Sequence, residues 1–311
     1  MQTNFNIPLN EIQEVELELT GICNLKCPLC TRNYLHANHQ KVKNVRPIED
    51  IIKQLDTFKK LKHINLAGTV SEPTLYPDII KLLEYIISRD IEIDFYSNAS
   101  ILDLNLWENI GKLLNKPEHK IIFTVCGTNQ ELHEIYRKGS KLENILLNLK
   151  EFQKHSSRDY GQYIVFDYNK EDSKQSDKIL RHFNNSFIIG SEGRRLLNEY
   201  NNKFSEDIKP IKEREIKINA IFKLGETKFK RKSKYQIDCI SYNQKRLYID
   251  QFGKYYACYS QAEFYKDSNI EFAEPNNFNY TNIKNFKYKD CLKCEQQSIK
   301  MIEDDNLQFI F

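Results

Sequence analysis

The fold is decided by the stretch Val15-Glu-Leu-Glu-Leu-Thr20-Gly-Ile-Cys23-Asn-Leu-Lys-Cys27-Pro-Leu-Cys30. Its first six residues are expected to form a short strand, and three cysteines follow that strand on what is expected to be one loop. Three thiolates from one loop can hold three irons of a [4Fe–4S] cluster and leave the fourth iron open. An open metal position is typical of a reactive site, whereas a closed one mostly supports structure or electron storage.

Strand-like runs alternate with helical patterns from about residue 14 to residue 190. The expected strands are Val15–Thr20, His63–Ala67, Ile91–Ser97, Lys120–Cys126, Gln162–Asp167 and Phe187–Gly190. Apolar residues recur with helical spacing in two intervening segments, Ile79–Ile86 and Leu142–Phe152. Six strand–helix units in series predict a parallel α/β sheet, open or curled into a partial barrel. Catalytic groups of parallel barrels gather at the carboxyl ends of the strands, which is where the three cysteines fall.

The rest of the chain has a different character. Residues 191–235 are rich in Lys, Glu and Asn, lack a firm pattern and are expected to form a connector. A hairpin is expected next, from Leu247–Asp250 and Tyr255–Tyr259, with Gly253 supplying the positive φ of a tight turn. We therefore predict a core domain at 1–190, a connector at 191–235 and a small domain at 236–311.

The composition limits the classes of protein to which this chain can belong. Its 46 basic and 43 acidic residues lack the basic excess of proteins that bind nucleic acid. No run of about eighteen apolar residues occurs, and residues 1–10 show no charged leader followed by an apolar core. We therefore expect no nucleic-acid partner, no membrane span and no signal peptide, with a cytoplasmic location as the default. There, eight cysteines are better explained by metal or redox chemistry than by disulfides.

Zinc is the alternative at the first cysteine group. Cys27 and Cys30 with His36 and His39 would make a Cys₂His₂ set. That set leaves Cys23 unused and confines all ligands to a short stretch, which is tight for a zinc fold. The iron–sulfur interpretation is favoured, and zinc stays open as the lesser one.

The C-x3-C-x2-C spacing of Cys23, Cys27 and Cys30 after an expected strand resembles the radical S-adenosylmethionine (SAM) superfamily. The resemblance implies a partial (β/α)6 TIM-like barrel in which the open iron chelates SAM. Reductive cleavage of SAM then yields a 5′-deoxyadenosyl radical, which abstracts hydrogen from a substrate. A reductant such as flavodoxin or ferredoxin is the implied electron source. Leu29 stands where the family often has an aromatic residue beside the adenine.

Further motifs carry the resemblance through at least residues 14–150. Ala67-Gly-Thr-Val-Ser-Glu-Pro-Thr-Leu75 is similar to the Gly-Gly-Glu-Pro element, and Ser97-Asn-Ala99 to the Thr-Asn-Gly element. Thr124-Val-Cys-Gly127 and Arg137-Lys-Gly-Ser140 look like elements of peptide-modifying members. The positions expected at SAM are Leu29, Gly68, Ser71, Glu72, Ser97, Asn98, Thr124 and Arg137.

A second cysteine group lies in the last quarter of the chain. Cys239, Gly253 and Cys258 match the C-x9–15-G-x4-C opening of the SPASM and twitch extensions, and Cys291-Leu-Lys-Cys294 follows. Four cysteines fit one fully ligated auxiliary [4Fe–4S] cluster, so the chain resembles the twitch subtype. Spacing alone suits zinc equally well, because Cys₄ sites bind both metals.

Cys126 belongs to neither group. It ends an expected strand, where side chains alternate between faces, so it shares a face with Thr124 while Val125 opposes both. If that face is the interior, its thiol stands near the SAM site as a candidate hydrogen donor, in the manner of radical SAM epimerases. The alternative is a buried core cysteine, since free cysteine is among the most buried residue types.

Three functions follow, in order of preference. The first is epimerisation, oxidation or crosslinking of a ribosomally made peptide by a radical SAM enzyme. The second is a radical SAM dehydrogenase or epimerase of a sugar or aminocyclitol. The third is a non-catalytic zinc or iron–sulfur protein. No leader-binding domain is expected before residue 14, which counts against the peptide function. Only the resemblance of the motifs to those of peptide-modifying members favours the peptide function over the carbohydrate one.

Overall fold

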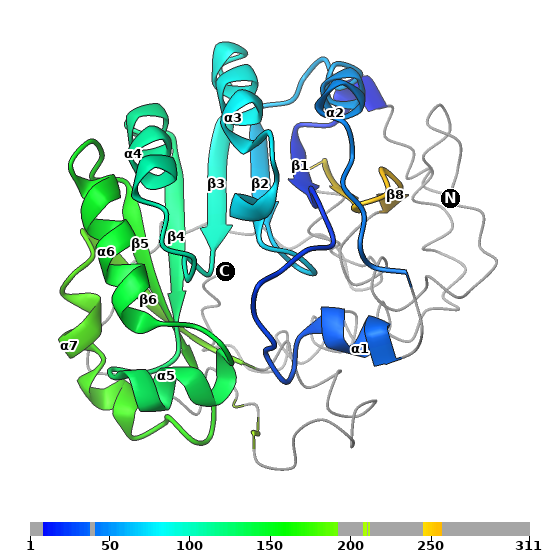
Figure 1. Ribbon diagram of the computed structural model, residues 1–311. Helices are drawn as coiled ribbons and strands as arrows, with labels where there is room; N and C mark the ends of the chain where they lie inside the picture. The colour runs from blue at the N-terminus through cyan, green and yellow to red at the C-terminus, as the bar shows by residue number, and fades with distance from the viewer. Residues whose placement is uncertain (1–8, 38–40, 192–207, 210, 212–244, 257–311) are drawn as a thin grey trace, which may run out of the picture.

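One eight-stranded sheet forms the centre of the part of the chain that the computed structural model describes, residues 9–37, 41–191, 208–209, 211 and 245–256. Its strand order is β6-β5-β4-β3-β2-β1-β7-β8 (Figure 1). The strands are β1 (Glu14–Leu17), β2 (His63–Ala67), β3 (Glu92–Ser97), β4 (Lys120–Val125), β5 (Asp159–Val165), β6 (Asn185–Gly190), β7 (Arg246–Ile249) and β8 (Tyr255–Tyr256). Every neighbouring pair is parallel except β7 and β8. The predicted open parallel α/β sheet of a partial barrel is confirmed.

Helices connect the strands. They are α1 (Thr31–Ala37), α2 (Ile48–Leu55), α3 (Ile79–Ser88), α4 (Leu104–Leu113), α5 (Gln130–Tyr136), α6 (Leu142–Gln153) and α7 (Asp177–Leu180). Short 3-10 turns occur at Leu9–Glu11, Pro73–Leu75 and Asp172–Gln175. In Figure 1, α1 and α5 lie beyond the arrowheads of the strands, at the carboxyl edge of the sheet. Among the described residues, no helix is long and apolar enough to cross a membrane.

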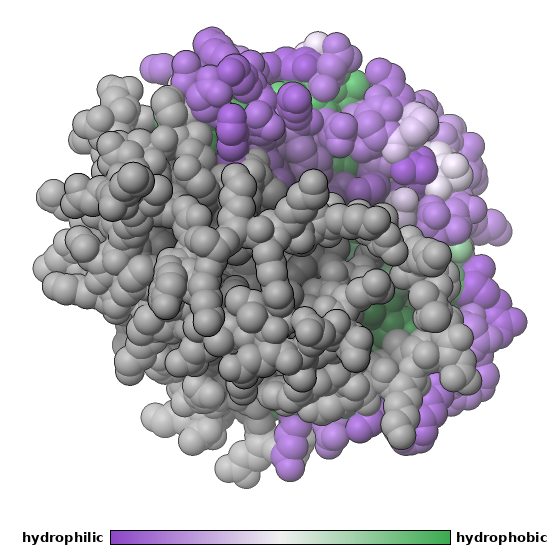
Figure 2. All heavy atoms as spheres, turned by 180° about the vertical axis from the view of Figure 1, so that it is seen from behind, coloured by the Kyte–Doolittle hydropathy of each residue, from purple (hydrophilic) through white to green (hydrophobic). Residues whose placement is uncertain are grey.

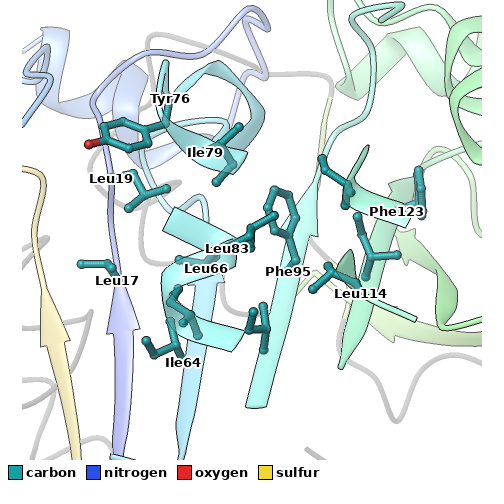
Figure 3. Packing of buried hydrophobic residues seen from close by; sticks show 14 of the residues in the cluster. Leu17, Leu19, Ile64, Leu66, Tyr76, Ile79, Leu83, Phe95, Leu114 and Phe123 are labelled. Carbon is teal, nitrogen blue, oxygen red and sulfur yellow. The ribbon is translucent and has the colours of Figure 1, made fainter. Parts of the chain in front are cut away.

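The helices cover one face of the sheet because the strands present apolar residues there at every second position. Val15 and Leu17 of β1 are buried in a single core with the apolar faces of α2, α3, α4 and α6, which we call the helix-side core. Figure 3 shows Leu17, Ile64 and Phe95 packed in this layer. Seen from behind, most of the described residues that reach the surface are hydrophilic (Figure 2). Burial of this apolar layer is the main stabilising contribution to the fold.

The opposite face of the sheet is polar along β1, β2 and β3. Glu14, Glu16 and Glu18 alternate with the core residues of the first strand and its extension, so their side chains point away from the helix-side core. A parallel sheet covered by apolar layers on both faces would have nearly continuous apolar strands instead. The polar face is therefore where this sheet can hold ligands or charged groups.

Among the six predicted core strands, two boundaries differ from the prediction by three residues, and the others agree within two. β1 ends at Leu17 rather than Thr20, because Thr20 leaves the ladder and pairs with Val45 in an isolated antiparallel bridge. β5 begins at Asp159, three residues before the predicted Gln162. Side chains on Asn184 and Gln153 hydrogen-bond to the Asp159 carboxylate and hold this start in place.

The predicted hairpin is confirmed, and it lies in an unexpected place. β7 and β8 are antiparallel around Gly253, which has φ +82°. β7 also pairs in parallel with β1, so the hairpin extends the main sheet at its open edge. Only residues 245–256 of the predicted small domain are described, and the boundaries at 190 and 235 stay predictions.

A chain of ion pairs crosses the amino end of the polar face. His63 Nδ1 lies 3.3 Å from the Glu14 carboxylate and His63 Nε2 lies 3.5 Å from that of Asp94. Arg246 donates to Glu14 from Nε at 2.8 Å, and Lys120 lies 3.5 Å from Asp94. Burial lowers the pKa of His63, but its hydrogen bonds to Asp94 and Glu14 outweigh that effect and raise the pKa to about 9.

This network makes stability depend on pH. Because the pKa of His63 is higher in the folded chain than in the unfolded one, its contribution is complete below about pH 6.5 and is lost as the pH rises through about 9. We expect His63→Gln to remove about 2 to 3 kcal/mol of unfolding free energy at pH 6 and much less at pH 10. Urea unfolding at both pH values measures this, with the exposed His182→Gln as control. An equal loss at both pH values would contradict the assignment.

Candidate active site at the carboxyl edge

The loop after β1 brings the three cysteines to the carboxyl edge of the sheet. Its end is a tight turn, in which Cys30 N–H donates to the Cys27 carbonyl at 3.1 Å and the Asn33 side chain donates to the same carbonyl at 2.7 Å. Cys27 is buried, while Cys23 and Cys30 are half-buried. The Leu25 amide N–H points at Cys23 Sγ at 3.4 Å, a contact that favours a thiolate.

The chemistry of this donor set fits a cluster with one iron per cysteine. Burial raises the pKa of the Cys23 thiol to about 12, with further contributions from the charges of Glu72, Cys30 and Cys27. Cysteine thiols release their protons when they bind a metal, and the positive charge of iron would offset the unfavourable charge of the thiolates. Within the described range, no three Cys, His, Asp or Glu side chains surround a single point as the ligands of one metal ion do.

A buried carboxylate, Glu18, holds the segment after β2 against the end of β1. It accepts hydrogen bonds from the backbone N–H groups of Thr69 (2.9 Å) and Val70 (3.2 Å) and from the Ser71 hydroxyl. Tyr248 OH on β7 donates to it at 3.4 Å. Burial raises the pKa of Glu18 to about 8, and the three donors oppose that rise. Glu18 thereby fixes three of the residues that follow the expected SAM position Gly68.

Gly68 allows this segment to turn back on itself. A Cβ at Gly68 would lie 2.0 Å from the Ser71 carbonyl oxygen, which is a backbone clash. Any other residue would therefore force the segment to shift.

A second buried carboxylate, Glu72, connects the segment after β2 with the loop after β3. It accepts from Ser97 Oγ at 2.6 Å and from Asn98 N–H at 2.7 Å. Its own N–H donates to the Ile22 carbonyl at 2.8 Å, beside Cys23. Asn98 Nδ2 in turn lies 3.7 Å from Cys23 Sγ. Glu72 therefore joins three loops of the edge into one unit.

Most of the expected SAM positions thus come together around the cysteine loop. The Ser71 hydroxyl donates to Glu18 and the Ser97 hydroxyl donates to Glu72, so here they position the loops of the site. Direct contact of Ser71, Glu72 and Ser97 with SAM stays a prediction. Thr124 is buried and its hydroxyl donates to the Ser97 carbonyl at 3.3 Å.

Leu29 and Cys126 lie in a second apolar group, here called the cysteine-side cluster. Its members are Leu25, Cys27, Leu29, Cys126, Tyr136, Ile164, Phe166 and Ile208, with Cys23 and Cys30 packed against it. Val125 lies in the helix-side core instead, so Cys126 is on the opposite face from Val125, as the alternation predicted. Cys126 is fully buried. The sequence alone could not show that Cys126 lies in the same cluster as the cysteine loop.

Arg137 lies beside two of these cysteines. Burial lowers the pKa of its guanidinium, but the neighbouring Cys126 and Cys27 sulfurs outweigh burial and raise that pKa. The Lys26 N–H donates to the Lys138 carbonyl at 3.1 Å and ties the two loops together. Arg137 is therefore a fixed positive charge next to the candidate cluster loop.

His133 supports the end of β4. The Cys126 N–H donates to His133 Nδ1 at 3.3 Å, so His133 Nε2 carries the proton and donates to Ser140 Oγ at 2.8 Å. Burial lowers the pKa of His133 to about 3, which keeps the ring neutral. This role of His133 was not predicted from the sequence, and neither was that of Glu18. The alternation of acidic and apolar residues over 14–19 was the available signal for Glu18.

Several expected ligands cannot be placed. Cys239, Cys258, Cys291, Cys294 and His39 lie outside the described residues. His36 is exposed on α1.

Glu72 is expected to stabilise the edge strongly. Glu72→Ala leaves the Ser97 hydroxyl and the Asn98 and Thr74 N–H groups without their acceptor, so we expect a loss of about 2 to 4 kcal/mol of unfolding free energy. Glu84→Ala, on the exposed face of α3, is the matched control. Urea unfolding of both variants measures the difference. A loss for Glu72→Ala as small as that of the control would contradict the role of Glu72 in holding the loops together.

Comparison with known proteins adds to this geometry. A probable GTP 3′,8-cyclase of Methanocaldococcus jannaschii is 27% identical over 141 residues. That match spans 45% of this chain and 45% of the relative, less than half of either. Streptococcus suis SuiB bound to S-adenosylmethionine has a TM-score of 0.55 at 17% identity, covering 93% of this chain and 71% of SuiB. SuiB bound to its precursor peptide SuiA has a TM-score of 0.56 at 16% identity, covering 92% and 69%.

At these identities the likeness to SuiB concerns the fold alone. The sequence model described as the radical SAM superfamily matches residues 17–176. That range contains the cysteine loop, both buried carboxylates and every expected SAM position. The chain is therefore an enzyme of the radical SAM superfamily.

Proposed function

We propose that this enzyme abstracts hydrogen from a peptide substrate at the carboxyl edge of the sheet. Cys23, Cys27 and Cys30 would hold a [4Fe–4S] cluster, and SAM would bind its open iron. When bound, this pair supplies a 5′-deoxyadenosyl radical. The observation that carries the proposal is the packing of the three cysteines against Cys126 on the polar side of the sheet.

The chain's own residues prepare the site in two ways. Glu18 and Glu72 hold the loops after β2 and β3 in fixed positions, so little reorganisation is needed when a ligand binds. The cysteine-side cluster surrounds the thiols with apolar side chains such as Leu29 and Phe166, which exclude water from a reactive intermediate.

A peptide substrate is favoured by two observations. The Arg137–Ser140 element, which resembles that of peptide-modifying members, lies against the cysteine loop through the Lys26–Lys138 hydrogen bond. The fold also resembles that of SuiB, which is described with a precursor peptide bound. The partial relative named as a GTP cyclase supports the alternative, a radical SAM enzyme of a small molecule such as a sugar or aminocyclitol.

An auxiliary [4Fe–4S] cluster on Cys239, Cys258, Cys291 and Cys294 is part of the proposal. Gly253 of the C-x9–15-G-x4-C pattern forms the predicted turn with positive φ. The hairpin that carries it is joined to β1, the strand that leads into the cysteine loop. Such a cluster would suit electron transfer to or from the site, with flavodoxin or ferredoxin as the external reductant.

Metal content tests this assignment. Anaerobic reconstitution is expected to give about eight irons and eight sulfides per chain, together with reductant-driven formation of 5′-deoxyadenosine. The triple variant Cys23→Ala/Cys27→Ala/Cys30→Ala is expected to keep about four irons and to lose SAM cleavage. The reciprocal variant, in which Cys239, Cys258, Cys291 and Cys294 are alanine, tests the second site separately from the first. Zinc without SAM cleavage in the wild-type protein would contradict the proposal.

Cys126 is proposed as the hydrogen donor to the substrate radical. Its S–H bond would break and a substrate C–H bond would form, leaving a thiyl radical that takes up one electron from the reductant and one proton. We expect Cys126→Ala to form 5′-deoxyadenosine without epimerised product, and deuterium from solvent to enter the wild-type product. Product stereochemistry by chiral analysis measures this, with Cys126→Ser as the size-matched variant. An unchanged product in both variants would exclude the donor role.

A further inference from the structure

Three polar side chains stand together on the polar face of the sheet, between the ion pairs of the amino end and the cysteine loop. They are Glu16 on β1, Asn65 on β2 and Tyr96 on β3. Glu16 and Asn65 are register partners in the β1–β2 ladder. Neighbouring strands are about 4.8 Å apart, so one ligand group can reach both side chains. Their neighbours Leu17, Ile64 and Leu66 pack on the opposite face (Figure 3).

The carboxylate of Glu16 has no partner among the described residues. The Glu16 residue is 7% exposed, and no hydrogen bond or ion pair reaches its side chain there. Arg246, the cation whose charge acts on Glu16, donates its hydrogen bond to Glu14. Burial, partly offset by the charge of Arg246, raises the pKa of Glu16 to about 7.

Asn65 repeats the same pattern. Its Oδ1 atom is buried and accepts no hydrogen bond within the described part of the chain. Tyr96 lies on the next strand, β3, where its register partner on β2 is Ala67, two residues beyond Asn65. Burial, followed by the charges of Asp94 and Glu16, raises the pKa of its hydroxyl. As whole residues, Asn65 and Tyr96 are half-buried.

Unpaired acceptors of this kind are unfavourable in a folded protein. A buried carboxylate is almost always paired, and a buried amide oxygen normally accepts a hydrogen bond. Glu16 and Asn65 lie on adjacent strands, and neither acceptor has a donor in the described part of the chain, so one ligand donor would account for both. Two residues further along the chain, just past the end of β1, Glu18 holds the loop beside the cysteines, about 6.6 Å away if the backbone stays extended.

We propose that Glu16 and Asn65 bind a protonated nitrogen of the substrate, with Tyr96 completing the site. This inference rests on the proposed function, because it assigns the substrate of that same site. A cation with N–H donors satisfies both acceptors and the charge at once, and the Tyr96 ring suits a cation as well. An anion would be repelled by the Glu16 carboxylate and the Asn65 amide oxygen. The nitrogen can come from a lysine-type side chain of a peptide or from the amine of an aminocyclitol.

Binding of model amines to the reconstituted, SAM-loaded enzyme tests the proposal. The probes are Nα-acetyl-lysine methylamide for a peptide source and 2-deoxystreptamine for an aminocyclitol source. Nα-acetyl-norleucine methylamide is the uncharged match of the first probe. We expect at least one cationic probe to bind by calorimetry, the uncharged match not to bind, and Glu16→Gln and Asn65→Leu each to weaken binding at least tenfold. Glu84→Gln, at an exposed position on α3, is expected to bind as the wild type does.

A second readout separates a ligand-binding role from a structural one. The empty Glu16→Gln protein is expected to melt at a higher temperature than the wild type at pH 8, because the variant removes an unpaired buried charge. A residue that serves only the fold would show the opposite sign. Asn65→Leu provides an independent test should Glu16→Gln fail to fold.

The outcomes are distinct. Binding of only the lysine probe or only the aminocyclitol supports the inference and identifies the source. Failure of both cationic probes, equal binding of the uncharged match, or unchanged binding by both variants overturns it. SAM cleavage by the wild-type enzyme tests the proposed function separately. Cleavage without probe binding overturns only this inference, and probe binding without cleavage overturns only the proposed function.

Discussion

The hydrogen bonds to two buried carboxylates hold the whole carboxyl edge together. Glu18 fixes the segment after β2, and Glu72 joins that segment to the loop after β3 and to the cysteine loop at Ile22. Neither carboxylate is paired with a cation in the described residues, so backbone N–H groups and hydroxyls carry the full stabilisation. The protein's own hydrogen bonds thus hold the loops around the cysteines, and Glu72 N–H anchors the cysteine loop itself at Ile22.

The second constraint is the two-faced character of the sheet. Alternation in β1 sends Val15 and Leu17 to the helices and Glu16 to the other side. One face thereby provides stability through apolar burial, while the other can hold charges, ligands and the Cys126 thiol. This division also explains why the polar face carries both an ion-pair network and acceptors that have no donor among the described residues.

Local sequence patterns predicted much of the fold and of the candidate site. β2 has the predicted bounds, the apolar spacing of α3 and α6 is buried as expected, and alternation placed Cys126 opposite Val125. The pairing of β7 with β1 had no such signal, because it joins residues far apart in the sequence. The partners of Glu18 and Glu72 were equally hidden, since each carboxylate is bonded by a loop that follows another strand. Motif spacing located the cysteine loop, but only the folded chain shows Arg137 and Cys126 beside it.

The central claim is that SAM binds an open iron held by Cys23, Cys27 and Cys30. Electron paramagnetic resonance of the reduced enzyme tests it most directly, using a variant in which the last four cysteines are alanine so that one cluster contributes. The account predicts that SAM changes the g-values of this cluster, and that SAM with a ¹⁷O-labelled carboxylate gives a hyperfine coupling. A spectrum unaffected by SAM would contradict the account.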